Sequence, residues 1–95
     1  MALPPIHPGR ILADELVELG MSANALARAM DVPANRITEI LNGRRAITAD
    51  TALRLAHYFG ISAKFWLNLQ QNYDLAVVER DQGAAIARAV RPRAA

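Results

Sequence analysis

The sequence of residues 21–41 is MSANALARAMDVPANRITEIL, and residues 42–45 (NGRR) follow directly. Apolar residues recur at helical spacing on both sides of residues 31–33 (DVP), which predicts two short helices joined by a tight turn. Ser22 suits the N-cap of the first helix, and Pro33 suits the start of the second. This arrangement is typical of a helix-turn-helix whose second helix enters the major groove of DNA.

The flanking sequence predicts three further helices around this pair. We expect them at residues 9–19, 48–59 and 63–80, because each range has an apolar stripe at helical spacing and a terminal cap or glycine. The prediction is an all-α, compact bundle of about five helices, a lambda-repressor-like helix-turn-helix domain. We expect a flexible leader over residues 1–7, a single domain over residues 8–81 and a flexible Ala/Arg-rich tail over residues 82–95.

The composition supports a small globular helical domain. Of 95 residues, 53% are hydrophobic and only 5% are aromatic, and the net charge is +2. Lys64 is the only lysine, so nearly all the positive charge comes from arginine, which suits forked contacts to phosphate and guanine. The chain has no cysteine, and we identify no signal peptide and no apolar run that spans a membrane. These observations favour a cytoplasmic location.

No feature of the sequence indicates an enzyme. His7 and His57 lie far apart with no second ligand at metal-binding spacing, so we expect no metal site. The patterns HExxH and GxSxG and the P-loop are absent, and we expect no cofactor.

The outward face of the second motif helix carries the predicted base contacts. Ala34 suits contact with a thymine methyl group, and Asn35 suits a forked contact with adenine. Thr38 lies on the same face. Arg36 is either a base reader or a phosphate contact, depending on the angle of the helix. Glu39 either accepts a hydrogen bond from cytosine or repels phosphate in a wrong register.

The predicted phosphate contacts flank that helix on both sides. Ser22 and Asn24 lie at the start of the preceding helix, where backbone N–H groups and the helix dipole attract anions. Asn42, Arg44 and Arg45 follow the second helix, and we expect them to contact the DNA backbone on its other side.

The last predicted helix is our candidate for a homodimer interface. Trp66, Leu69, Tyr73 and Val77 give it more apolar surface than one intramolecular face needs. The alternative is that all of these side chains pack in the core of the protomer, because a small domain needs every large residue. A two-fold dimer would bind a palindromic operator in double-stranded DNA, with half-sites about 10 bp apart.

The chain resembles the HigA family of antitoxins, within the Cro/repressor-type (XRE) helix-turn-helix class. The resemblance rests on residues 7–16 (HPGRILADEL), on the motif, on residues 42–60 (NGRRAITADTALRLAHYFG) and on residues 61–75 (ISAKFWLNLQQNYDL). It implies a homodimer of five-helix protomers that represses its own operon and neutralises a small toxin, a HigB-like mRNA endonuclease. The DNA-contacting positions that it implies are Ser22, Ala34, Asn35, Arg36, Thr38 and Arg45.

Two positions depart from the family pattern. Arg10 stands where an acidic residue is usual, and Asp31 stands in the turn where glycine is common. One alternative to an antitoxin is a stand-alone transcriptional regulator with no toxin partner. Another is a protein-binding module with a vestigial helix-turn-helix, which the arginines of residues 42–45 and the polar outward face disfavour.

Overall fold

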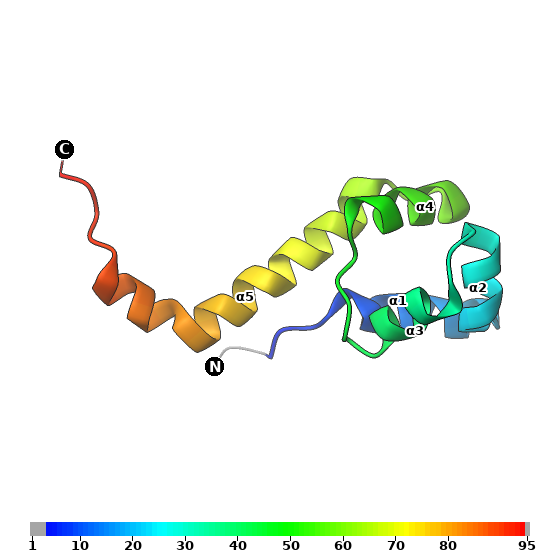
Figure 1. Cartoon of the computed structure of the whole chain (residues 1–95), viewed down its shortest axis with the longest axis horizontal. Helices are drawn as coiled ribbons and strands as arrows, with labels where there is room; N and C mark the ends of the chain where they lie inside the picture. Colours follow the sequence, from blue (N-terminus) through cyan, green and yellow to red (C-terminus); the bar gives the residue numbers. More distant parts are fainter. Residues whose placement is uncertain (1–3, 95) are drawn as a thin grey trace.

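The computed structural model describes residues 4–94, which contain five helices and no strand (Figure 1). The all-α prediction is therefore confirmed. Four helices and the beginning of the fifth form the body of the molecule, and the rest of the fifth extends away from it. The helices are α1 (Pro8–Leu19), α2 (Ala23–Met30), α3 (Ala34–Leu41), α4 (Ala49–Phe59) and α5 (Ala63–Ala89).

Side-chain caps explain where four of these five described helices begin. A side-chain atom accepts a hydrogen bond from a backbone N–H group in the first turn of α1, α2, α4 and α5. These caps satisfy donors that have no partner inside a helix. The capping residues are His7, Ser22, Thr48 and Ser62.

The turn between α2 and α3 depends on one residue in the left-handed region. Asp31 has φ 56° and ψ 50°, and it is the only non-glycine residue with positive φ in the described part of the chain. Aspartate tolerates this conformation better than most residues, which is why it can replace the glycine that is common at this position.

The core lies between the first four helices and the first turns of α5. Trp66 is only 2% exposed, and its ring lies beside those of Phe59 and Phe65, with centroids 6.3 and 5.2 Å away. The interpretation of Trp66 as a dimer contact is therefore wrong, because this small core uses its largest side chain. Leu69 is half-buried against the same core. The buried apolar residues are Leu12, Leu16, Leu26, Ala27, Met30, Ile37, Ile40, Ile47, Ala52, Leu55 and Trp66.

The two ends of the chain differ from the predicted leader and tail. Residues 82–89 continue α5 instead of forming a flexible tail, because their alanines, glutamine and arginine are good helix formers. Residues 90–94 follow without regular structure, and α5 bends where its colour changes from yellow to orange (Figure 1). At the other end, His7 caps α1 and so belongs to the folded body, residues 4–6 have no regular structure, and residues 1–3 lie outside the described part.

The beginning of α1 crosses the end of α3 at very short range. A Cβ atom added to Gly9 would lie 1.8 Å from the backbone oxygen of Ile40, and no side chain fits there. His7 is adjacent, and its Nδ1 accepts a hydrogen bond of 2.9 Å from the Gly9 N–H group. The glycine therefore permits α3 to pack directly on the start of α1.

Replacing Gly9 with alanine should cost about 3 kcal/mol of stability or more, because the backbone of α3 has to move away from α1. Chemical denaturation of the purified variant measures this loss. Gly83→Ala is the matched control, since its added Cβ would meet only Glu79 Cβ at 3.9 Å. The control should gain roughly 0.5–1 kcal/mol from helix propensity. Equal stability of the two variants would contradict the proposed contact.

Candidate nucleic-acid interface

Helix α3 presents a polar surface over a buried apolar one. Ile37 and Ile40 are fully buried against α1 and α2, so the opposite side of α3 faces outward. Ala34 and Asn35 are exposed at its first turn. The small and polar residues at this end leave the backbone accessible, as a helix that enters a DNA groove requires.

The charged residues of α3 are paired within the protomer. Arg36 donates from Nη1 to Asp50 Oδ2 on α4, and Glu39 Oε1 accepts from Arg45 Nη2, each at 2.5 Å. Three of these four side chains were predicted from the sequence as DNA contacts, but their partners were not. The partners lie 14 and 6 positions away in the sequence, on α4 and in the loop after α3, so no local pattern indicated these pairs.

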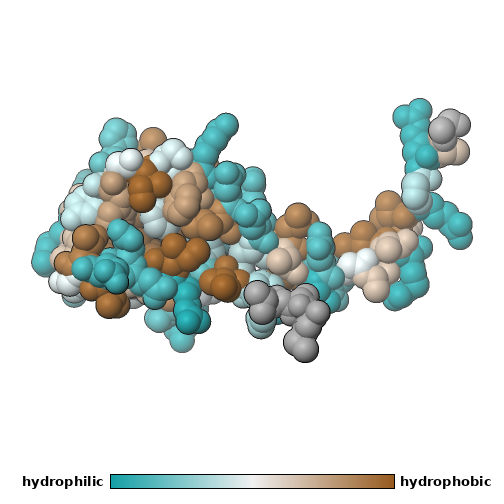
Figure 2. All heavy atoms as spheres, turned by 180° about the vertical axis from the view of Figure 1, so that it is seen from behind, coloured by the Kyte–Doolittle hydropathy of each residue, from teal (hydrophilic) through white to brown (hydrophobic). Residues whose placement is uncertain are grey.

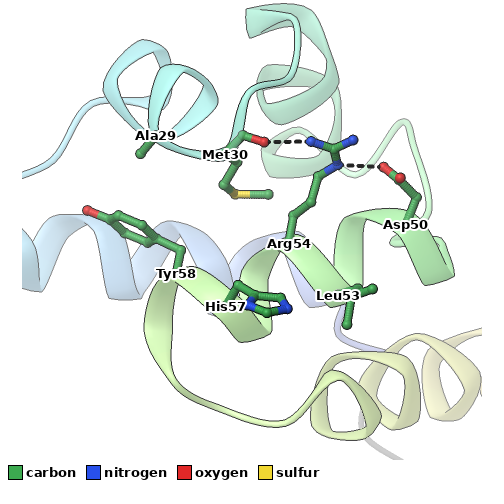
Figure 3. Close-up of a pocket in the computed structure, with 7 residues that line it drawn as sticks. All are labelled: Ala29, Met30, Asp50, Leu53, Arg54, His57 and Tyr58. Carbon is green, nitrogen blue, oxygen red and sulfur yellow. Dashed lines mark hydrogen bonds and ion pairs between the residues drawn. The ribbon is translucent and has the colours of Figure 1, made fainter.

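Asp50 and Arg54 connect α4 to the turn of the motif (Figure 3). Arg54 Nε donates to Asp50 Oδ2 at 2.9 Å, and Arg54 Nη1 donates to the backbone oxygens of Met30 at 2.8 Å and Asp31 at 3.2 Å. Hydrogen bonds from Arg54 and then Arg36 lower the pKa of the Asp50 carboxyl group. The sequence analysis did not identify this role of Asp50, although the i, i+4 spacing of Asp50 and Arg54 was an available signal.

The predicted phosphate contacts lie at the surface on both sides of α3. Ser22 and Asn24 are exposed at the start of α2, where Ser22 Oγ accepts from the Ala25 N–H group at 3.1 Å. Asn42 ends α3, and Arg44 and Arg45 are exposed in the loop that follows.

A buried glutamine positions that loop, and no pattern in the sequence predicted it. Gln70 on α5 is 6% exposed, and its Oε1 accepts from the Ile47 N–H group at 2.8 Å. Its Nε2 donates to Asp74 Oδ1 at 2.9 Å. Ile47 is itself buried, so the two contacts fix the end of the loop that carries Arg44 and Arg45.

His7 lies close to this loop and contacts the start of α1, α5 and the residues that follow α3. Its ring contacts Tyr73 edge to face, with centroids 4.9 Å apart, and lies beside Gly43. Burial lowers the pKa of the imidazole, while the Asp74 carboxylate and the Arg45 backbone oxygen oppose that shift. A neutral ring is the form that can accept the hydrogen bond at the start of α1. Tyr73 is thus engaged within the protomer, although it was predicted as a dimer contact.

Two further findings concern residues 4–94 only. No helix there combines the length and the apolarity that crossing a membrane requires. Nor does this part of the chain bring together three or more histidine, aspartate or glutamate side chains that could bind a metal ion.

Comparison with known proteins identifies the class to which this geometry belongs. A family model described as helix-turn-helix matches residues 12–66. Among curated proteins, virulence-associated protein I of Dichelobacter nodosus is 53% identical over 81 residues, which cover 84% of this chain and 75% of that protein.

Two solved structures are close to this fold over nearly the whole chain. The addiction module antidote protein of the HigA family from Coxiella burnetii has a TM-score of 0.93 at 54% identity, covering 96% of this chain and 100% of that one. Pseudomonas aeruginosa antitoxin HigA, solved with the higBA promoter, has a TM-score of 0.91 at 46% identity, covering 95% and 99%.

The chain belongs to the helix-turn-helix family of DNA-binding proteins. Within that family it is similar to HigA-family antitoxins, as the resemblance of its motifs predicted. These relatives are DNA-binding antitoxins and not enzymes.

Proposed function

We propose that this chain is an antitoxin that binds a palindromic operator as a homodimer, represses its own operon and neutralises a HigB-like mRNA endonuclease. The observation that carries the proposal is the exposed polar first turn of α3 above the buried Ile37 and Ile40. The similarity of the chain to an antitoxin whose structure was solved with a promoter supports DNA as the ligand. The proposal also places the protein in the cytoplasm, where an operon and its mRNA are found.

Base contacts are assigned to the outward face of α3. Asn35 is exposed and unencumbered, so it reads adenine through its amide group. Ala34 contacts a thymine methyl group, and Thr38 lies one turn further along. Arg36 and Glu39 are half-buried and ion-paired, so each contributes from a fixed position.

Phosphate contacts are assigned to the two ends of the motif. Ser22 and Asn24 bind one side of the groove through the start of α2, and Asn42, Arg44 and Arg45 bind the other. Arg45 is paired with Glu39 and exchanges this carboxylate for phosphate when DNA binds, whereas Arg44 makes no ion pair among the described residues.

The dimer is assigned to the part of α5 that extends beyond the body. Leu75, Val78 and Ile86 are 61%, 40% and 44% exposed, and their spacing puts them on one side of the helix. Figure 2 shows apolar residues recurring along this projecting arm. Val77, which was predicted as a dimer contact, is half-buried and lies on the opposite side of the helix from Leu75 and Ile86, so it is not part of this stripe. A lone helix with such an apolar stripe is stable when a second copy covers it.

Expression of the small reading frame next to this gene tests the antitoxin role. We expect growth arrest that co-expression of this chain relieves, with the two proteins purifying together. The full chain with Leu75→Asp and Val78→Asp serves as a dimer-deficient comparison in the same assay. Absence of arrest, or arrest that this chain does not relieve, would replace the antitoxin with a stand-alone transcriptional regulator.

Two alanine variants test the division between base and phosphate contacts. Asn35→Ala should cost about 1–3 kcal/mol on the operator and relax the preference at one base position. Arg45→Ala should weaken all sequences alike and lower the salt slope by about one unit. Titrations of operator and scrambled duplexes at several salt concentrations separate the two effects. A changed base preference in Arg45→Ala at constant slope would contradict the division.

The combined change Leu75→Asp and Val78→Asp should convert the dimer into a folded monomer, because two carboxylates cannot be buried in an apolar interface. Sedimentation measures the mass, and helical circular dichroism measures the fold. Leu53→Asp is the matched control. Leu53 is an apolar side chain on α4 that is 56% exposed, and it lies outside the proposed interface, so its replacement should leave the mass unchanged. A dimer that survives the double substitution would move the interface elsewhere.

A further inference from the structure

Arg36 is fixed in place by a carboxylate that belongs to another helix. Its guanidinium group pairs with Asp50 in the first turn of α4, and the two side chains are 28% and 54% exposed. An unpaired arginine at the start of a recognition helix has many rotamers and a phosphate within reach in most of them. Pairing with Asp50 limits those rotamers and uses only one of the five N–H donors in the contacts seen here.

Asp50 is itself fixed, and this distinguishes it from an ordinary surface acid. Its Oδ2 atom accepts from Arg54 as well as from Arg36. Arg54 in turn is bound to the backbone oxygens of Met30 and Asp31 in the turn of the motif. A continuous series of contacts therefore runs from the turn through Arg54 and Asp50 to Arg36 on α3. Figure 3 shows its first part, from Met30 through Arg54 to Asp50.

The pair also changes what DNA meets at this position. A hollow of about 180 Å³ next to the pair is lined by Arg36, Arg45, Thr48, Asp50 and neighbouring residues. The Asp50 carboxylate offsets the positive charge of Arg36, so this arginine attracts the DNA backbone less strongly than an unpaired arginine would. Its remaining donors are available to a base edge that lies in the direction that Asp50 imposes.

We propose that Asp50 is a positioning residue that sets the sequence specificity of DNA binding by directing Arg36 toward one base of the operator half-site. The inference rests on the proposed function, because it requires that α3 reads DNA. It assigns to α4 a part in specificity, whereas the helix-turn-helix itself comprises only α2 and α3. Arg54 acts through Asp50 and so supports the same direction.

Selection from a randomised pool of DNA duplexes tests this proposal with the full chain. Wild type defines the preferred half-site, and Arg36→Ala should lose the preference at one position within it. Asp50→Ala should lose that same preference by roughly tenfold, and its affinity for a scrambled duplex should rise several-fold as Arg36 turns to phosphate. Asp50→Asn, which keeps an oxygen acceptor, should restore most of the preference. Arg36→Ala with Asp50→Ala should show no further loss beyond Arg36→Ala alone.

Asp14→Ala is the matched control, because it removes one exposed carboxylate from α1. A purely electrostatic role of Asp50 would raise the affinity for preferred and scrambled duplexes by one common factor, as in the control. That result would overturn the proposal and leave the proposed function intact. If wild type selects no sequence, both fail. Thermal unfolding verifies the fold, and Asp50→Ser replaces Asp50→Ala if the alanine variant does not fold.

Discussion

The close crossing of α1 and α3 at Gly9 is the contact on which the rest of the structure depends. Helix α3 has only eight residues and is too short to be stable without packing. Its buried side consists of Ile37 and Ile40, and the Ile40 backbone oxygen lies where Gly9 has no side chain. The direction in which the outward face of α3 points therefore depends on how closely α1 packs against its buried side. Any residue that separates the two helices also turns the surface that we propose to face DNA.

Polar contacts from other helices then position the turn, the side chains and the loop around α3. Arg54 binds the turn, Asp50 binds Arg36, and Gln70 binds the loop that begins after α3. Each of these side chains comes from α4 or α5, so the helices behind the motif determine the positions of its reading and contacting residues. The motif is short, but the set of residues that shapes it extends over half of the chain.

Much of this fold is predictable from the sequence because its determinants are local. Apolar spacing located the helices, and Ser22, Thr48 and Ser62 located three helix starts through hydrogen bonds within one turn. The ion pairs of Arg36 and Arg45 were not predictable, since each needs two segments to meet in space. The predicted end of this helix at residue 80 was too early, because the residues around Gly83 favour helix strongly enough for α5 to continue past it.

The burial of Trp66 has a consequence for how this molecule can be observed. It is the only tryptophan in the chain, and side chains of its own protomer surround the indole ring. Its Nε1 has no hydrogen-bond partner within the described residues. Tryptophan fluorescence thus arises from a single buried environment at the junction of α4 and α5. The emission wavelength reports whether α4 and α5 remain packed together. An event confined to the outer surface of α3 or to the far end of α5 leaves that wavelength unchanged.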